Sequence, residues 1–179
     1  MKERQPVIHI VHGDITRLEV DAIVNAANRS LLGGGGVDGA IHQAAGPDLL
    51  AECKKLGGCE TGQAQITRGY RLPAKYVIHA VGPVWNGGFS HESYLLSSCY
   101  RVSLNIAISY GLHSIAFPCI STGIYRFPGG YAAKIAWHAV HQIADEHPDT
   151  MPEVTFCCFL NEDYEYYSAL QAGLNIPDF

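Results

Sequence analysis

The sequence predicts an α/β layered fold with a largely parallel sheet. Short apolar runs alternate with longer stretches of helical character along the whole chain of 179 residues. Such alternation is typical of strands joined by crossover helices, which sets neighbouring strands parallel. The length matches one domain, and no repeat, low-complexity segment or linker interrupts the pattern. We therefore expect a single domain over residues 1–179.

Each element follows from a local pattern. The apolar runs predicted as strands are Val7–Val11, Ala22–Val24, Ala64–Thr67, Tyr76–Ala80, Ser114–Phe117 and Val154–Leu160. One helix is predicted to start near Val37, because apolar residues recur from there to Ala45 at helical spacing. The other predicted helices are Leu95–Tyr110, Ala132–His147 and Asn161–Ala172. Pro128 is expected to be the first helical residue before Ala132, and Gly82–Ser90 a turn-rich loop.

The composition excludes several classes of protein. With 47% hydrophobic and 16% charged residues, the chain is too apolar for a disordered segment. No run approaches the roughly 18 apolar residues of a membrane-spanning helix, and the polar start does not resemble a signal peptide. A net charge of −5 with 12 scattered Lys and Arg residues argues against nucleic-acid binding as the main task. We expect a cytoplasmic protein whose six cysteines are reduced.

The strongest local signal is a run of four consecutive glycines: Gly33, Gly34, Gly35 and Gly36. The helix predicted from Val37 follows directly, and a glycine-rich turn at a helix N-terminus presents free amides and the helix dipole to an anion. A flexible surface loop is the alternative. The run lacks the Lys-Ser/Thr ending of a Walker A loop. Its GxGxxG match lies several polar residues after the strand, so we reject a dinucleotide-dehydrogenase site.

A second candidate loop follows the strand predicted over Ser114–Phe117. It contains two hydroxyls, a glycine and an aromatic residue: Ser121, Thr122, Gly123, Ile124 and Tyr125. Its amides could hold the other side of the same anion, or it could be an ordinary strand-to-helix turn. Ligands of open α/β sheets bind beyond the carboxyl ends of parallel strands, so each loop supports the interpretation of the other. Tyr125 either faces a sugar or packs in the core.

Polar side chains near these loops are candidates for contact with a sugar or a base. Asp38 and His42 share a helix face, where Asp38 either accepts a sugar hydroxyl or holds a water, or merely caps the helix. The helix dipole favours the ionised form of Asp38, and His42 is assigned a supporting position beside it. Asn28 can donate to and accept from a ribose diol, or it can form a local turn. Asp14 could accept from the amine of a base or bind the Thr16 amide locally.

Together these motifs resemble the macrodomain family, in particular its MacroD-type branch. They are GDIT at Gly13–Thr16, NAAN and GGGGVDGAIH between Asn25 and His42, AGP at Ala45–Pro47, HAVGPVW at His79–Trp85 and STGIY at Ser121–Tyr125. The resemblance covers nearly the whole chain, and the order of the motifs is highly specific. It implies a three-layer α/β/α sandwich with a mixed, largely parallel sheet. It also implies an enzyme that removes ADP-ribose from acidic side chains and deacetylates O-acetyl-ADP-ribose.

The resemblance assigns the adenine and diphosphate contacts. Asp14 would bind the adenine amine, with the Ile15 amide beside it, and Phe159, near the end of the last strand, would pack on the adenine ring. The diphosphate would lie between Gly33–Gly36 with Val37 on one side and Ser121–Tyr125 on the other.

The resemblance also implies the reaction and its alternatives. Asn28 and Asp38 would address the distal ribose, with Asp38 holding the attacking water. The expected ligands are ADP-ribose and its esters, and the expected partners are mono-ADP-ribosylated proteins. No cofactor and no metal are expected, because Gly57–Thr61 does not supply the Cys/His insertion of the zinc-containing branch, and we expect a monomer. The alternatives are a non-catalytic ADP-ribose reader and an ADP-ribose 1″-phosphate phosphatase. One departure, Arg126-Phe127 where many relatives have Gly-Tyr, could alter substrate preference.

Overall fold

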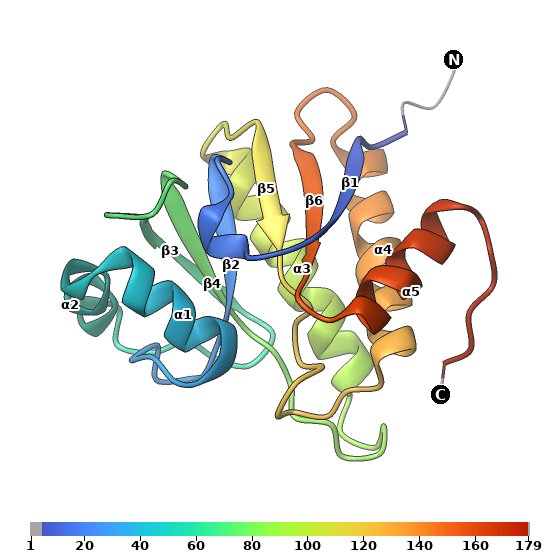
Figure 1. Cartoon of the computed structure of the whole chain (residues 1–179), viewed down its shortest axis with the longest axis horizontal. Coiled ribbons are helices and arrows are strands. Elements are labelled where there is room, and N and C mark those ends of the chain that lie inside the picture. Colours follow the sequence, from blue (N-terminus) through green and yellow to red (C-terminus); the bar gives the residue numbers. More distant parts are fainter. Residues whose placement is uncertain (1–4, 179) are drawn as a thin grey trace.

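The computed structural model describes residues 5–178, which contain one six-stranded sheet with helices on both faces (Figure 1). The strands are β1 (Ile8–His12), β2 (Ala22–Ala27), β3 (Ala64–Arg68), β4 (Tyr76–Val81), β5 (Ser114–Phe117) and β6 (Glu153–Cys158). Their order across the sheet is β1-β6-β5-β2-β4-β3. Every neighbouring pair is parallel except β3 and β4, which are antiparallel. The predicted α/β class with a mixed, largely parallel sheet is confirmed.

The helices connect and cover the strands. They are α1 (Gly36–Ala45), α2 (Pro47–Leu56), α3 (Glu92–Ser109), α4 (Gly129–Glu146) and α5 (Asn161–Gln171), with a short 3-10 turn η1 (Ile15–Arg17) after β1. The sequence prediction omitted α2, although Pro47 at its start and Gly57 in a left-handed conformation at its end are typical helix boundaries. Pro128 directly precedes α4 and is not its first helical residue, so that prediction is wrong by one position.

The last strand ends earlier than predicted. β6 stops at Cys158, so Phe159 lies beyond the strand and is 81% exposed. Its carbonyl oxygen is 3.0 Å from Nε2 of His12, which lies at the end of the neighbouring strand β1. The chain leaves the sheet here and enters α5, which begins at Asn161 with the extended Leu160 as its N-cap residue.

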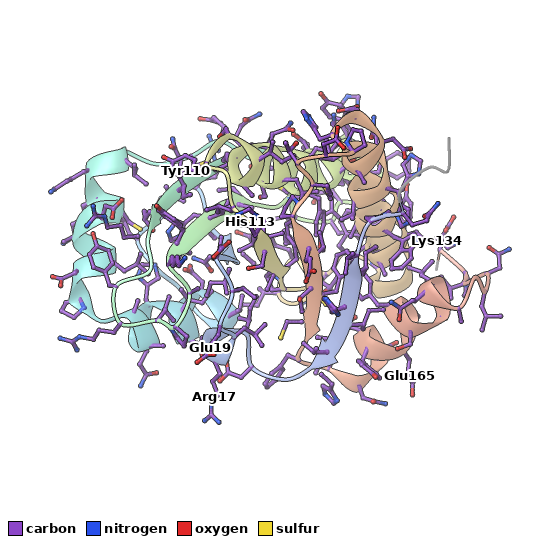
Figure 2. The ribbon with its side chains drawn as sticks, turned by 90° about the horizontal axis from the view of Figure 1, so that it is seen from above. Arg17, Glu19, Tyr110, His113, Lys134 and Glu165 are labelled. Atoms are coloured by element: carbon purple, nitrogen blue, oxygen red, sulfur yellow. The ribbon has the colours of Figure 1, made fainter. Side chains whose placement is uncertain are left out.

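The sheet separates two cores of different composition. The core shared with α3, α4 and α5 contains the aromatic residues Tyr100, Phe117, Phe127, Phe156 and Tyr167. The core shared with α1 and α2 contains aliphatic residues and cysteine but no aromatic ring among the described residues that form it. Cys157 lies in the second core and Cys158 in the first, because consecutive residues of a strand point to opposite faces. Charged side chains such as Arg17 and Glu165 point outward in Figure 2.

One edge of the sheet gathers the segments predicted to bind a ligand. β1, β6, β5 and β2 are neighbours and run in the same direction, so their carboxyl ends meet at the same edge. Neighbouring strands lie about 4.8 Å apart, so these four span roughly 14 Å. This is the edge at which open α/β sheets bind extended ligands.

Candidate functional site

The predicted contacts follow one another along this edge. Asp14 follows β1, Phe159 follows β6, Ser121–Tyr125 follows β5, and the glycine segment follows β2. The first two are tied together, because the Gly13 amide donates to the Cys158 carbonyl at 2.9 Å. The edge therefore presents an acidic residue, an aromatic ring and two amide-rich loops in a fixed order.

Asn28 shapes the glycine segment (Gly33–Gly36). Its Nδ2 donates to the Gly33 carbonyl at 2.9 Å, while its Oδ1 accepts from the amide and the hydroxyl of Ser30 at 3.2 and 2.6 Å. The turn-forming role of Asn28, the alternative to ribose binding, is thus present in this structure. Because both ends of the amide are engaged, Asn28 fixes where Gly33 and Gly34 lie above α1.

The second loop, Ser121–Tyr125, is held by the segment that follows β4. The Trp85 amide donates to the Tyr125 carbonyl at 2.8 Å, and the Phe127 amide donates to the Ser121 carbonyl at 2.9 Å. Ser121 has φ of 67°, a left-handed conformation that is uncommon for a residue with a side chain. Its buried hydroxyl lies so close to Gly82 that any Cβ at position 82 would overlap it. Gly82 therefore permits the close approach of these two loops.

Both loops expose backbone donors. Among residues 5–178, the amides of Gly33–Gly35 and of Ser121–Tyr125 meet no hydrogen-bond acceptor. The amides of Gly36 and Val37 open α1, so they have no acceptor within the helix either. Two groups of unpaired amides, one at a helix N-terminus, form the arrangement that binds phosphates in many α/β proteins.

Asp38 is a buried carboxylate beside these amides. It is 5% exposed, and its Oδ1 accepts from Nδ2 of Asn25 at 2.8 Å and lies 3.4 Å from Nε2 of His42. Burial raises the pKa of the Asp38 carboxyl above its usual value, while the Asn25 hydrogen bond and the His42 charge oppose this rise. The sequence predicts the helix dipole at Asp38, which favours the ionised form, but it does not reveal the burial of this carboxyl.

A chain of buried polar groups continues inward from Asp38. Asn25 on β2 is paired in register with His79 on β4, and its Nδ2 lies 3.1 Å from Nδ1 of His79. On the other side of the ring, Nε2 lies 2.9 Å from the Thr67 hydroxyl on β3 and 3.7 Å from Sγ of Cys53 on α2. Sequence reasoning missed Asn25, His79 and Thr67 as a group, because they belong to three different strands.

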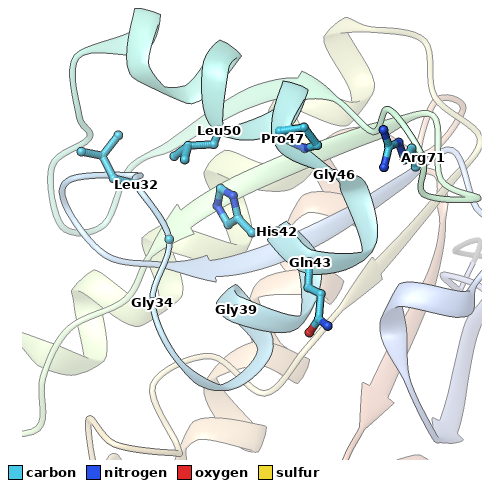
Figure 3. A pocket seen from close by; sticks show the side chains of 10 residues that line it. Leu32, Gly34, Gly39, His42, Gln43, Gly46, Pro47, Leu50 and Arg71 are labelled. Atoms are coloured by element: carbon cyan, nitrogen blue, oxygen red, sulfur yellow. The ribbon is translucent and has the colours of Figure 1, made fainter.

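A hollow of about 510 Å³ adjoins the glycine segment on the side of α1 and α2 (Figure 3). Gly33, Gly34 and His42 line it, together with Leu50 and Arg71. Figure 3 shows the His42 ring pointing from α1 into this space. The loop Ser121–Tyr125 does not line it. The hollow therefore touches only one half of the predicted anion site.

The remaining predicted residues lie at the rim. Asp14 accepts from the amide and the hydroxyl of Thr16 at 2.9 and 2.7 Å, so its local turn is present, while its side chain remains half exposed. These bonds lower the pKa of Asp14 and keep it ionised. Tyr125 is half-buried and Ile124 is exposed. In the Arg126-Phe127 pair, Arg126 is exposed, whereas Phe127 packs on Trp85 with ring centroids 4.8 Å apart.

Metal-ligating side chains do not gather in the part of the chain that the structure describes. Within it, no three His, Cys, Asp or Glu side chains come together as a metal site. None of the helices in residues 5–178 combines the length and the hydropathy that crossing a bilayer requires.

Comparison with known proteins places this geometry in a family. The macro domain family model matches residues 24–136. A macro domain-containing protein of Chlorobaculum tepidum is 60% identical over 93% of this chain and 97% of its own length. The ADP-ribose glycohydrolase MACROD2 of Xenopus laevis is 58% identical over 87% of this chain, which spans only 37% of that longer relative.

A solved structure agrees with these relatives. The Trypanosoma brucei macrodomain in complex with ADP-ribose is 45% identical and has a TM-score of 0.87, with 92% of this chain and 68% of that chain covered. The region matched by the family model includes β2 from Val24 onward, the glycine segment, the polar residues Asp38, Asn25 and His79, and Ser121–Tyr125. The chain therefore belongs to the macro domain family, within its MacroD-type branch.

Proposed function

We propose that the protein is a hydrolase that binds ADP-ribose and cleaves ester-linked ADP-ribose. Its substrates would be O-acetyl-ADP-ribose, proteins that carry mono-ADP-ribose on acidic side chains, or both. Relatives named ADP-ribose glycohydrolase and the neighbour that binds ADP-ribose support this class of ligand and reaction.

The order of groups along the strand ends is the observation that carries the proposal. Asp14 and Phe159 at one end suit the amine and the face of adenine. The unpaired amides of the two loops lie in the middle and suit a diphosphate, which carries the negative charge that backbone donors attract. Asn28 and Asp38 follow at the other end and suit a ribose. ADP-ribose has its adenosine, diphosphate and second ribose in this same order.

Asp38 supplies the chemistry in this proposal. Its carboxylate would accept a hydrogen bond from a water and hold it for attack on the ester. Addition of the water breaks the ester C–O bond and yields a carboxylic acid and a free hydroxyl. Burial raises the pKa of Asp38, which makes its ionised form a better proton acceptor than an exposed aspartate. The neighbouring Asn25 amide keeps that form populated.

Turnover is the first test. The full chain is incubated with O-acetyl-ADP-ribose and, separately, with a protein that carries ADP-ribose on glutamate. We expect release of acetate or of ADP-ribose from at least one substrate. If the protein binds ADP-ribose but turns over neither ester, it is a reader. If it releases phosphate from ADP-ribose 1″-phosphate instead, it is a phosphatase.

Binding is tested at Gly123, where an added side chain meets no atom within 4 Å in the free protein. Gly123→Glu and Gly123→Gln should therefore fold equally well and differ only in charge. We expect Gly123→Glu to bind ADP-ribose far more weakly than Gly123→Gln, because a carboxylate would face the diphosphate. Equal affinities by calorimetry would place the diphosphate elsewhere.

A further inference from the structure

His79 is the one imidazole enclosed by the chain of polar groups behind Asp38. It is 0% exposed, lies in the middle of β4 and projects into the core beneath α1 and α2. Asn25 borders it on β2 and Thr67 on β3, while Cys53 approaches from α2. The proposed reaction leaves this residue without a role, yet a buried polar ring among apolar neighbours is costly unless its hydrogen bonds are satisfied.

The contacts determine which nitrogen of His79 carries the proton. Nδ2 of Asn25 can only donate, so Nδ1 of His79 must accept from it and is unprotonated. The neutral ring then has its proton on Nε2, which donates to the Thr67 hydroxyl at 2.9 Å. The Thr67 hydroxyl in turn donates to the Arg68 carbonyl at 3.1 Å. From Asn25 inward, each of these three donors therefore points toward the Arg68 carbonyl.

The tautomer of His79 fixes the orientation of the Asn25 amide. Nδ2 uses one hydrogen for His79 and the other for Asp38. If the amide turned over, its oxygen would face both the Nδ1 lone pair and the Asp38 carboxylate, which are acceptors. The Oδ1 of Asn25 is buried and meets no partner among the described residues. The amide keeps this orientation although its oxygen is unpaired, because its nitrogen serves two acceptors.

We infer that His79 is a positioning residue of the proposed reaction: its Nδ1 holds the Asn25 amide so that Nδ2 donates to Asp38 and keeps that carboxylate ionised. The inference rests on the proposed function only for its effect on turnover. The effect on the Asp38 carboxyl exists whether or not the protein hydrolyses an ester.

Several titratable groups surround the buried polar groups Asn25, His79 and Thr67. His42 from α1 faces both Asp38 and His79, with the two imidazole centroids 6.3 Å apart. Cys53 from α2 faces His79, and the charge of the adjacent Glu52 acts on the Cys53 thiol. Burial lowers the pKa of His79 to about 3, so it stays neutral at every pH suited to an assay. Burial raises the pKa of Cys53 to about 11, so this thiol is neutral there as well.

Two substitutions of His79 distinguish the hydrogen-bond acceptor at Nδ1 from the space that the ring fills. His79→Phe fills the space but offers no acceptor to Asn25, whereas His79→Asn can place an oxygen near the position of Nδ1. The isosteric Thr67→Val keeps the imidazole and removes the acceptor of Nε2. Each full-length variant is first checked for folding by circular dichroism and for ADP-ribose affinity by calorimetry.

The measurements are kcat and KM against pH, and the titration of the Asp38 carboxyl by ¹³C NMR without substrate. For His79→Phe we expect kcat to fall about tenfold with KM nearly unchanged. Its Asp38 titration should move to higher pH by about half a unit to one unit. His79→Asn should stay close to the unchanged protein. Thr67→Val should move the Asp38 titration in the same direction by less, and the ¹⁵N shifts of His79 should show a mixture of tautomers.

Each outcome decides the inference. An unmoved Asp38 titration in folded His79→Phe overturns it. An equal loss in His79→Asn and His79→Phe reduces His79 to a packing role and also overturns it. If His79→Phe does not fold, an unmoved Asp38 titration in Thr67→Val overturns the inference instead. If the unchanged protein hydrolyses neither ester, the proposed function fails, and the NMR titration still decides the role of His79.

Discussion

The two faces of the sheet differ in what fills them. On the α3–α5 side, aromatic rings stack against one another, and Phe156 contacts Tyr167 with centroids 4.3 Å apart and Phe117 at 6.1 Å. On the α1–α2 side, the core is aliphatic and encloses the polar groups Asn25, His79 and Asp38. Large apolar surfaces stabilise a fold, whereas buried polar groups contribute little net stability and are costly when unpaired. This protein therefore keeps its main source of stability and its polar groups on opposite faces of one sheet.

The largest expected effect tests the aromatic face. Phe156→Ala should lower the free energy of unfolding by about 3–5 kcal/mol, because it opens a cavity among rings that cannot collapse fully. Chemical denaturation measures this value, and ADP-ribose affinity at low temperature should be unchanged. Ile23→Val on the aliphatic face is the control and should cost about 0.5–1.5 kcal/mol. A loss in Phe156→Ala no larger than in Ile23→Val, which removes one methylene group, would show that the stacked rings contribute little to stability.

The next effect tests the polar face. Asp38→Ala should lower the rate of ester hydrolysis by about 10²-fold or more, since water positioning and proton acceptance are lost together. ADP-ribose affinity should weaken by about 1–3 kcal/mol, because the loop amides remain. The free energy of unfolding should change far less than in Phe156→Ala. Near-normal turnover on both esters would show that Asp38 does not hold the water.

A third prediction concerns pH and the buried imidazole. The pKa of His79 falls from 6.5 to about 3 on folding, so the unfolded chain binds a proton that the folded protein excludes. Stability should therefore fall as the pH falls below 6.5, by about 2 kcal/mol at pH 5. The raised pKa of Asp38 acts in the opposite direction, because the folded protein then holds a proton that the unfolded chain releases. His79→Asn, which cannot titrate, should give a flatter profile in denaturant titrations between pH 6.5 and 5, and an equally steep one would contradict the assignment.

The smallest effect tests the adenine end of the site. Phe159 is 81% exposed and contributes little to either core. Phe159→Ala should leave the free energy of unfolding within about 0.5 kcal/mol of the unchanged protein. It should weaken ADP-ribose binding by about 1 kcal/mol through loss of ring stacking. Calorimetry with ADP-ribose and with ribose 5-phosphate tests whether the loss comes from adenine stacking. Only the affinity for ADP-ribose, which carries the adenine ring, should fall. An unchanged affinity for ADP-ribose would remove Phe159 from the site.

The sequence predicts the parts of this molecule that repeat a local pattern. Apolar runs located all six strands, and the glycine run located the start of α1, because both patterns reflect burial or backbone freedom within a few residues. The antiparallel direction of β3 could not be predicted, since an apolar run has the same pattern in either direction. Helix α2 was missed although its two buried residues, Leu49 and Cys53, are four positions apart, as one face of a helix requires.

The candidate site could be predicted only where its residues are close together in the sequence. Asp38 and the glycines are neighbours in sequence, so their association is visible there. Asn25, His79 and Thr67 meet through strand register, which brings together residues 12 and 54 positions apart. A histidine within an apolar strand looks like an isolated polar residue until its partners on the next strands are known.

The contact between Gly82 and Ser121 limits how this protein can diverge. A side chain at position 82 would overlap the Ser121 hydroxyl and lie 2.6 Å from Cγ2 of Ile120. Ser121 is itself held in a left-handed conformation by the loop that carries the unpaired amides. A replacement at position 82 would therefore displace both Ser121 and Ile120, and with them the loop that carries the unpaired amides. Changes that alter substrate preference without moving this loop are therefore easier at positions outside the contact, such as exposed Arg126.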